Sequence, residues 1–179
     1  PFERGGRYFL QKRAAGDDLW TIYMREGLEG DDRVLVDPHA LSADHTTSVG
    51  IHDVSPDGGL LAYFVREGGE DEVEIRLLDI DSGRHIESGL PRGHYFSLSI
   101  KPDRSGFYYT RHVPEIGSRI YYRALGAGSA GDELIFGDGY GPDKGMGCSV
   151  TEDGRRLGIV VWHGSAGHKS EIYYKDIVE

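Results

Sequence analysis

A pattern that recurs every 46 to 50 residues constrains the fold of this 179-residue chain more than any other feature. A turn containing Pro-Asp or Glu-Asp and a nearby glycine begins at Ser55, at Lys101 and at Thr151, and each copy leads into an apolar run. Ser55 and Lys101 are 46 residues apart, and Lys101 and Thr151 are 50 residues apart. A partial copy begins at Arg4. Such a period is typical of proteins built from stacked copies of one supersecondary unit.

Each unit contains short runs that alternate apolar and polar residues, which predict β-strands with one face towards a core. Asp-Gly and Pro-Asp pairs between the runs predict hairpin turns. The runs fall into four classes by their order in the unit. First runs cover 48–54, 95–100 and 145–150; second runs cover 7–10, 60–64, 107–109 and 157–161; third runs cover 19–23, 73–80, 119–125 and 171–177; fourth runs cover 33–36, 84–87 and 133–136.

This order predicts an all-β fold, a partial β-propeller with about three to three and a half four-stranded antiparallel blades. A β-sandwich or a barrel would also use many strands, but it would not repeat one four-strand order with the same turn chemistry. No segment shows a convincing helical period. We expect one domain over 1–179, with blades at approximately 4–44, 48–91, 95–139 and 145–179.

The strand count also predicts open sheet edges. The first unit is expected to lack its first strand, and the last unit is expected to lack its fourth. Closed propellers have about four to eight blades, so this chain alone cannot close a ring. Open strand edges pair readily with other chains, and we therefore expect self-association.

Charge and hydropathy exclude several classes of partner. The net charge of −10 argues against nucleic acid, because a phosphate backbone would be repelled. No apolar stretch approaches the length of a membrane span, so we expect no membrane insertion. Asparagine is absent and arginine is much commoner than lysine, which we interpret as the codon bias of a GC-rich bacterium.

A single cysteine, Cys148, excludes an intrachain disulfide and a cysteine-based metal site. The sequence is therefore compatible with a reducing compartment, and we expect the cytoplasm, with the periplasm as the alternative. The chain begins with Pro1 rather than methionine, so we expect it to be part of a longer protein whose N-terminal targeting signal is not visible here.

Two glycine-serine segments approach the G-x-S-x-G motif of serine hydrolases without matching it. They are 127–131 and 163–167, and both are interpreted as hairpin loops. The segment 126–131 matches G-x-G-x-x-G, but a strand-like run follows it where a dinucleotide site needs a helix. We therefore predict no catalytic residue and no cofactor site on this chain.

The histidines and acidic residues also lack the spacing of a metal site. The eight histidines are scattered, and no pair shows the i, i+4 spacing of a helical zinc site. The segment 79–83 begins like a calcium loop, but its glycine is one place early and Leu90 stands where the loop needs glutamate. Cys148 lies in a first run and is expected to be a small buried residue. We predict no metal site.

The order of several motifs resembles the prolyl oligopeptidase family along the whole chain. Segments 3–9, 28–30, 33–38 and 41–42 resemble the first propeller blade of that family, 55–63 the second, and 120–126 with 132–134 the third. The similarity keeps its order through 145–147 and 151–154. Within the wider family, prolyl oligopeptidase fits better than oligopeptidase B.

The resemblance implies a seven-bladed propeller joined to a C-terminal α/β-hydrolase domain that cleaves short peptides after proline with a Ser-Asp-His triad. This chain would hold about the first half of the propeller and none of the triad, so it would help to select short proline-containing peptides. The resemblance also implies two substrate-pocket candidates, Tyr95 and Ile135. Ordinary packing within a blade is the alternative for both.

Two further hypotheses stay open at this point. The chain could be a non-catalytic propeller module that binds a protein partner, or part of a propeller enzyme with a sugar or metal site in its central channel. A downstream G-x-S-x-G followed by aspartate and histidine would decide for the peptidase.

Overall fold

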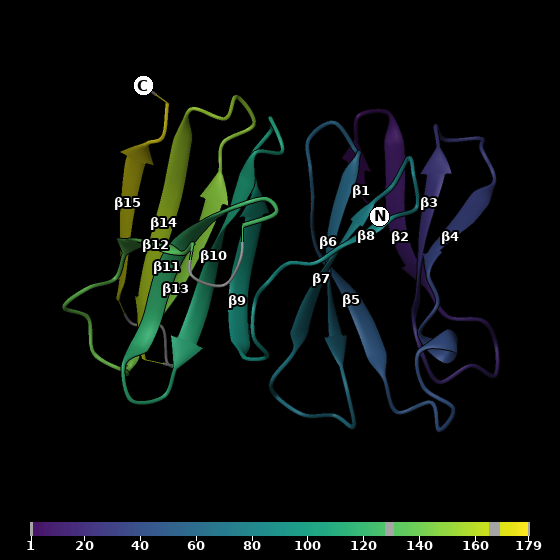
Figure 1. The fold of residues 1–179 in the computed structure, drawn as a ribbon, viewed down its shortest axis with the longest axis horizontal. Coiled ribbons are helices and arrows are strands. Elements are labelled where there is room, and N and C mark those ends of the chain that lie inside the picture. Colours follow the sequence, from purple (N-terminus) through teal and green to yellow (C-terminus); the bar gives the residue numbers. More distant parts are fainter. Residues whose placement is uncertain (1, 128–130, 165–168, 179) are drawn as a thin grey trace. The chain divides into compact units, whose positions relative to one another are not determined.

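A computed structural model describes residues 2–127, 131–164 and 169–178 of the chain. The strands of these residues form four antiparallel sheets, each of which connects its strands in chain order (Figure 1). The described residues contain no α-helix. The predicted all-β class and the repeated four-strand order are therefore confirmed. The chain divides into two compact units, Pro1–Ser88 and Gly89–Glu179, which are described separately below.

The first sheet contains four strands, which corrects the expectation that this unit lacks its first strand. The strands are β1 (Phe2–Arg4), β2 (Arg7–Lys12), β3 (Thr21–Glu26) and β4 (Asp32–Val36), in the order β1-β2-β3-β4. Gly5 and Gly6 join β1 to β2 with φ values of 58° and 80°, as a two-residue type I′ hairpin requires. With only three residues, β1 is too short to show an alternating pattern in the sequence.

A short 3₁₀ helix, η1 (Pro38–Ala40), follows β4 and was not predicted from the sequence. Asp37 caps it, because its side chain accepts a hydrogen bond from the backbone N–H of His39 at 3.0 Å. Pro38 occupies the first helical position, where its missing N–H costs nothing.

The second sheet completes the first unit. It contains β5 (Ser48–Val54), β6 (Leu60–Arg66), β7 (Glu74–Asp79) and β8 (His85–Ile86). Apolar side chains from the first and second sheets form one buried cluster, which holds the two together by the hydrophobic effect. Its members are Phe9, Ile22, Met24, Val36, Val49, Val54, Leu61, Tyr63, Val65, Leu78 and Ile80.

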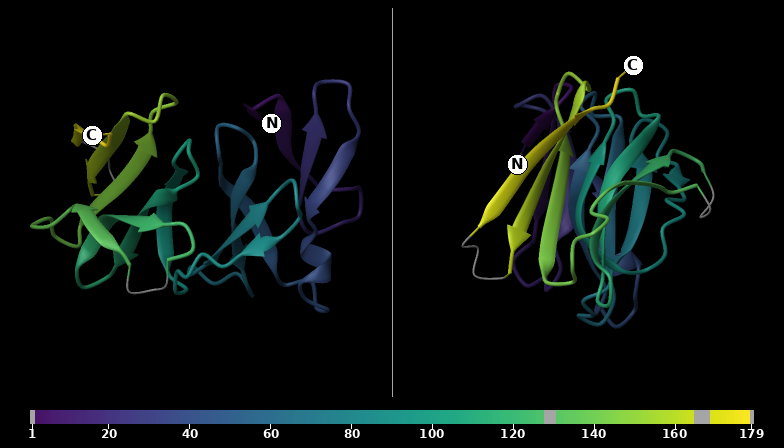
Figure 2. Two further views of the ribbon diagram at one scale, coloured as in Figure 1. Left: turned by 45° about the horizontal axis from the view of Figure 1, so that its top comes forward. Right: turned by 90° about the vertical axis from the view of Figure 1, so that its left-hand side faces the viewer.

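The second unit repeats this arrangement. Its first sheet contains β9 (His94–Ile100), β10 (Gly106–Val113), β11 (Gly117–Ala124) and β12 (Glu133–Phe136). Its second sheet contains β13 (Lys144–Val150), β14 (Arg156–His163) and β15 (Ser170–Asp176). Within the described residues this last sheet has three strands, as predicted. Figure 2 shows the twist of the strands within each sheet. The buried cluster between the two sheets contains Tyr108, Ile120, Met146, Cys148, Leu157, Ile159 and Val161.

Side-chain hydroxyls connect the first strands of neighbouring sheets in the second unit. The backbone N–H of Cys148 donates to Ser97 Oγ at 2.9 Å, and that of Val150 donates to Ser99 Oγ at 3.0 Å. These bonds join β9 to β13 without direct backbone pairing. The two strands β9 and β13 are therefore held close together.

Candidate functional site

Tyr95, the first pocket candidate from the sequence, lies near the start of β9. The side chain is partly buried, and its hydroxyl donates to the backbone oxygen of Pro91 at 2.5 Å. The ring centroid lies 5.8 Å from that of Tyr109 on β10. Tyr95 is therefore held by local contacts while part of its surface stays accessible.

Ile135, the second candidate, lies on β12 and packs against the buried cluster of the second unit. Its sheet has the order β12-β11-β10-β9, so Ile135 and Tyr95 lie on opposite edge strands. Three strand spacings amount to about 14 Å. The structure does not bring the two candidates together, and packing accounts for the position of Ile135.

Phe96, directly after Tyr95, contributes to an exposed aromatic patch that the sequence did not reveal. Thr110 pairs with Ser97 and Arg111 pairs with Tyr95, so Phe96 is the extra residue of a β-bulge. The Phe96 side chain is half exposed. Its ring lies 5.5 Å from that of His112 and 6.2 Å from that of Trp162. We call Phe96, His112 and Trp162 the aromatic patch. Its members lie on the three strands β9, β10 and β14, so no spacing in the sequence predicts it.

An ion pair joins β11 of the same sheet to the residue before β12, and its arginine is buried while its aspartate is partly exposed. Arg123 is 1% exposed, and its guanidinium donates two hydrogen bonds to the Asp132 carboxylate, at 2.6 and 2.8 Å. The bonds to Asp132 raise the pKa of Arg123, which stays charged. Burial raises the pKa of the neighbouring Tyr109, which stays neutral. A charge-assisted pair of this kind fixes the geometry of the blade.

A polar cluster forms around Glu171 on β15. Its carboxylate forms an ion pair with Lys169 at 2.7 Å, accepts hydrogen bonds from Tyr140 at 2.6 Å and Tyr173 at 2.7 Å, and lies 2.7 Å from His163 Nε2. The hydrogen bonds from Lys169 and from the two tyrosine hydroxyls hold the pKa of Glu171 well below its usual range. The cluster connects the loop after β12 to β14 and β15.

The segment that matches G-x-G-x-x-G and the two segments that approach G-x-S-x-G lie partly outside the described residues. Residues 128–130 of the first glycine-serine segment and 165–167 of the second are not described. The strand β12 follows the segment 126–131, so no helix N-terminus faces that turn as a dinucleotide site requires.

The described histidine, cysteine and acidic side chains do not gather into a group of three that could hold a metal ion. His39 and His45 lie with ring centroids 5.2 Å apart, and His39 Nδ1 lies 2.9 Å from Asp37 Oδ1. In the calcium-like segment, Asp79 accepts hydrogen bonds from the backbone and hydroxyl of Ser82. This geometry is that of a strand-ending turn. Among the described residues no helix is long and apolar enough to cross a membrane.

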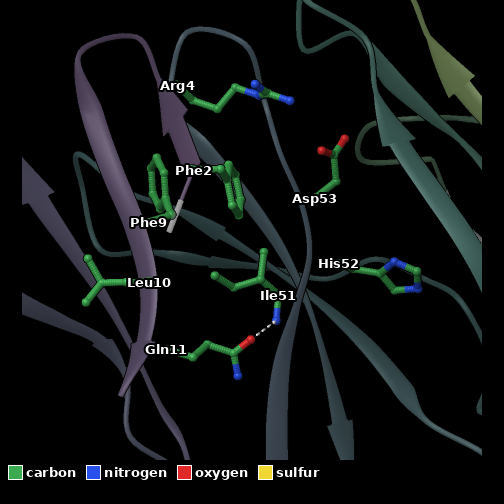
Figure 3. Close-up of a pocket in the computed structure, with 8 residues that line it drawn as sticks. All are labelled: Phe2, Arg4, Phe9, Leu10, Gln11, Ile51, His52 and Asp53. Carbon is green, nitrogen blue, oxygen red and sulfur yellow. Dashed lines mark hydrogen bonds between the residues drawn. The ribbon is translucent and has the colours of Figure 1, made fainter.

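A pocket of about 500 Å³ lies in the first unit, beside the short strand β1 (Figure 3). Gln11 spans its base: the side-chain Nε2 donates to Val49 O, and Oε1 accepts from the Ile51 N–H, both at 3.4 Å. His52 is the extra residue of a bulge in β5. The lining residues are Phe2, Arg4, Phe9, Leu10, Gln11, Ile51, His52 and Asp53. The pocket joins two segments about 40 residues apart, so no local motif could have revealed it.

The aromatic patch, the pocket and the Arg123–Asp132 pair do not form a nucleophile, base and orienting acid within hydrogen-bond reach of one another, as acyl transfer requires. They offer apolar and aromatic contacts with a few polar groups.

Comparison with known proteins is consistent with this arrangement. The family model of the prolyl oligopeptidase N-terminal beta-propeller domain matches residues 1–179. The prolyl endopeptidase of Elizabethkingia meningoseptica is 30% identical over 186 aligned positions, which cover 99% of this chain and 26% of that protein. The chain thus spans about a quarter of the length of this curated relative.

Two solved structures share the fold. One comes from work described as "Structural and Mechanistic Analysis of Two Prolyl Endopeptidases: Role of Inter-Domain Dynamics in Catalysis and Specificity". It matches with a TM-score of 0.85 and 27% identity, over 100% of this chain and 28% of that one. Prolyl oligopeptidase B from Galerina marginata, in its apo form, matches with a TM-score of 0.70 and 19% identity, over 97% of this chain and 29% of that one. At that identity the second likeness shows the fold alone. Because the family model covers every residue, the chain belongs to the N-terminal β-propeller domain family of the prolyl oligopeptidases.

Proposed function

We propose that this chain is the first part of the propeller of a proline-specific serine oligopeptidase, closer to prolyl oligopeptidase than to oligopeptidase B. In that protein the propeller admits short proline-containing peptides and keeps folded proteins away from the active site. The observation that carries the proposal is the match over the whole chain, with a TM-score of 0.85 to a prolyl endopeptidase structure.

The partner of the propeller in this proposal is a C-terminal α/β-hydrolase domain that carries the Ser-Asp-His triad. The coding sequence downstream of residue 179 tests this directly. We expect a G-x-S-x-G motif followed by aspartate and then histidine, the order of α/β-hydrolases. A downstream sequence without that order overturns the proposal and favours the non-catalytic binding module.

Size selection is tested on the complete peptidase. A short proline-containing peptide and the same sequence placed in a surface loop of a folded protein carry the same scissile bond. We expect cleavage of the free peptide and none of the folded protein, because the propeller excludes the larger substrate. Equal cleavage of both contradicts a gating role.

Tyr95 is the residue through which the described blades contact substrate in this proposal. Its partly exposed ring and its position next to the aromatic patch support this role. In the complete peptidase we expect Tyr95→Ala to raise KM for short proline peptides several-fold while kcat changes little. Leu28→Ala, at an exposed side chain of the first unit, is the control and leaves KM unchanged. An unchanged KM in Tyr95→Ala would show that Tyr95 does not contact the substrate.

Ile135→Ala distinguishes packing from substrate contact at the second candidate. Its contacts with the buried cluster favour packing, so we expect a lower free energy of unfolding with an unchanged KM. A raised KM at unchanged stability would instead place Ile135 in the pocket.

Self-association of the 179-residue chain through an open strand edge is also part of the proposal. Within the described residues β15 pairs only with β14, and it exposes Ile172 by 83% and Tyr174 by 72%. An apolar edge strand of this kind invites pairing. Sedimentation velocity should show dimers or larger species. The substitution Ile172→Lys places a charge on the edge strand and should lower the fraction of these species. A clean monomer of the unsubstituted chain over a wide concentration range contradicts this part.

A cytoplasmic location completes the proposal. The buried free thiol of Cys148 and the absence of any other cysteine fit a reducing compartment. Fractionation of cells that express the complete protein should find it in the cytoplasm, and recovery from the periplasm would contradict this.

A further inference from the structure

Aspartate followed directly by glycine occurs three times in the chain, at Asp57-Gly58, Asp138-Gly139 and Asp153-Gly154. In such a pair the backbone nitrogen of the glycine can attack the side-chain carboxyl of the aspartate, because a five-membered ring forms and glycine has no Cβ to crowd it. The first and third pairs belong to the repeated turn of the blades, whereas the second lies between β12 and β13. The fold therefore places one reactive dipeptide in two different environments.

In the repeated turn the backbone N–H of the glycine is bound to another acceptor. Gly58 N donates to the backbone oxygen of Ser55, and Gly154 N donates to that of Thr151, both at 2.8 Å. The nitrogen can attack the neighbouring carboxyl only after this hydrogen bond breaks and the turn opens. Ring closure is therefore obstructed at these two pairs.

The carboxylates of the same two turns are also held by hydrogen bonds. Asp57 Oδ1 accepts from Ser55 Oγ at 2.5 Å. Asp153 Oδ1 accepts from Thr151 Oγ1 at 2.6 Å and from the Arg155 N–H at 3.0 Å, and these bonds hold the pKa of Asp153 below its usual value. Ring closure needs the neutral carboxyl group, because an ionised carboxylate is a poor electrophile. The repeated turn therefore protects both partners of the reaction.

At the remaining pair the glycine N–H points at the carboxylate itself. Gly139 N donates to Asp138 Oδ1 at 3.1 Å, and both residues are exposed. A Cβ on Gly139 would meet no atom within 4 Å, whereas one on Gly58 would lie 2.5 Å from the backbone oxygen of Arg4. An amide nitrogen bound to one carboxyl oxygen lies beside the carbon of that group, as in a near-attack arrangement of about 3–3.5 Å.

The turn around this pair is anchored at both ends. Tyr140 N donates to the backbone oxygen of Gly137 at 3.1 Å, which closes a turn with Asp138 and Gly139 at its centre. Gly137 is buried, and the Tyr140 hydroxyl donates to Glu171 at 2.6 Å. The reactive centre of the turn thus faces solvent while its ends are fixed.

We propose that Asp138 is a covalent modification site, at which the fold favours spontaneous isomerisation to isoaspartate. Gly139 N loses its proton and forms a bond to Asp138 Cγ, and one carboxyl oxygen leaves as water, which gives a succinimide ring. A second water then opens the ring. Its addition to the backbone carbonyl carbon of Asp138 breaks the bond between that carbon and Gly139 N, so that the chain runs on through Cβ and Cγ. Its addition at Cγ restores aspartate. One water is released and one is consumed, and nothing is oxidised or reduced.

Isomerisation inserts a methylene group into the backbone of the anchored turn. Because the ends of the turn are fixed at Gly137 and Tyr140, we expect the longer backbone to move the Tyr140 hydroxyl away from Glu171. The isoaspartate fraction, separated by ion-exchange chromatography, should therefore unfold at a lower urea concentration than the unmodified fraction. Equal midpoints would contradict this displacement.

The test of the site follows all three pairs in one sample of the 179-residue chain. The folded chain is incubated in heavy-oxygen water, and samples taken at intervals are digested and analysed by liquid chromatography and mass spectrometry. Each passage through the ring adds one heavy oxygen to the residue, and isoaspartate peptides elute apart from aspartate peptides of the same sequence. The same chain unfolded in urea is the matched control, because it presents the three pairs without their turns.

In the folded chain we expect label to enter Asp138 at least about tenfold faster than Asp57 or Asp153, since the latter two must first lose the hydrogen bonds of their turns. In urea the three rates should agree within about threefold, because the turns are gone. Equal rates in the folded chain, or an equally large lead of Asp138 in urea, overturns the proposal.

Asp138→Glu tests the chemistry at the site. Glutamate keeps the charge but can close only a six-membered ring, which requires one more bond rotation to be fixed. Label at position 138 should fall to background, while label at Asp57 and Asp153 stays as in the unsubstituted chain. Label that persists at position 138 would show that the carboxyl exchanges oxygen without the ring and would overturn the assigned reaction.

Discussion

At the residue scale, one side chain stands where the repeat elsewhere uses glycine. Gly58 and Gly154 close their turns with φ values of 70°, whereas Arg104 closes the corresponding turn with φ of 54°. The backbone hydrogen bond across each turn is the same, because residues 58, 104 and 154 donate to the backbone oxygen three residues earlier. A side chain in this left-handed conformation costs about 1–2 kcal/mol.

We therefore predict that Arg104→Gly stabilises the chain. The relief of backbone strain exceeds the greater entropy that glycine gives to the unfolded state, about 0.5–1 kcal/mol, so the net gain is about 0.5–1 kcal/mol. The midpoint of urea unfolding should rise at an unchanged m-value. The reverse change, Gly154→Arg, is the matched control and should lower the midpoint. A lower midpoint in Arg104→Gly would contradict this interpretation.

Asp103, in the same turn, should contribute to stability in acid. It accepts hydrogen bonds from the hydroxyl and N–H of Ser105 at 2.7 and 2.9 Å, which lower its pKa to about 2. A pKa that is lower in the folded state adds stability above the unfolded value near 3.8, and this stability disappears as the pH falls towards 2. Asp103→Asn should flatten the decline of stability between pH 4 and pH 2. A decline as steep as that of the unsubstituted chain would contradict the assignment.

Loss of the Arg123–Asp132 ion pair should lower the free energy of unfolding more than loss of the Asp103 hydrogen bonds. Asp132→Asn removes a charged partner of a guanidinium that is 1% exposed, and removing one partner of a buried ion pair costs about 3 kcal/mol. Chemical denaturation should show that loss. Arg123→Met combined with Asp132→Leu is the control: it removes both charges and should recover much of the stability. A change of only a few tenths of a kcal/mol in Asp132→Asn would contradict the role of the pair.

At the scale of the elements, glycines in the first strands make room for aromatic rings on the second strands. Gly50 pairs with Phe64 across β5 and β6, and Gly145 pairs with Trp162 across β13 and β14. A Cβ on Gly145 would lie 1.8 Å from Trp162 Nε1, and one on Gly50 would lie 2.3 Å from the Phe64 ring. The second and fourth sheets therefore share a packing device that the turn motif alone does not reveal.

Gly145→Ala should displace Trp162 and destabilise the last sheet by about 1–3 kcal/mol, the usual range for overpacking. The tryptophan emission spectrum should shift, because the ring also contacts Phe96. Gly158→Ala is the control on the same sheet, since its Cβ would meet only Ser149 O at 3.5 Å. Equal effects of the two substitutions would contradict this account of Gly145.

Long, strongly alternating strands were predictable because their period is a local property. The third strands β3, β7, β11 and β15 and the second strands all lie where the sequence placed them. Features that depend on pairing were not predictable. The strand β1 has three residues and is defined only by its partner β2, and η1 depends on a capping side chain. The bulges at His52 and Phe96 depend on the register of two strands.

The candidate sites illustrate the same limit. Tyr95 and Ile135 came from a resemblance, and each occupies a strand position that packing alone can explain. The Arg123–Asp132 pair joins β11 to the residue before β12, and the pocket beside β1 brings together residues 2–11 and 51–53. Contacts between segments that are distant in the sequence depend on how the sheets pack against one another. Local sequence patterns do not determine that packing.

At the scale of the whole molecule, the chain consists of two compact units, each built from two neighbouring sheets with a shared core. Its described side chains form an aromatic patch, an ion pair and a pocket. The family match extends over all 179 residues and about a quarter of a curated relative. We propose on this basis that these blades select peptides and that the residues that cleave the peptide bond belong to another domain of the complete protein.

Incubation of the purified 179-residue chain with a short fluorogenic proline peptide tests this claim most directly, with the complete peptidase as the positive control. We expect the complete protein to cleave the peptide after proline and the chain alone to release no product at any concentration. Proline-specific cleavage that rises in proportion to the concentration of the purified chain would contradict a purely substrate-selecting role.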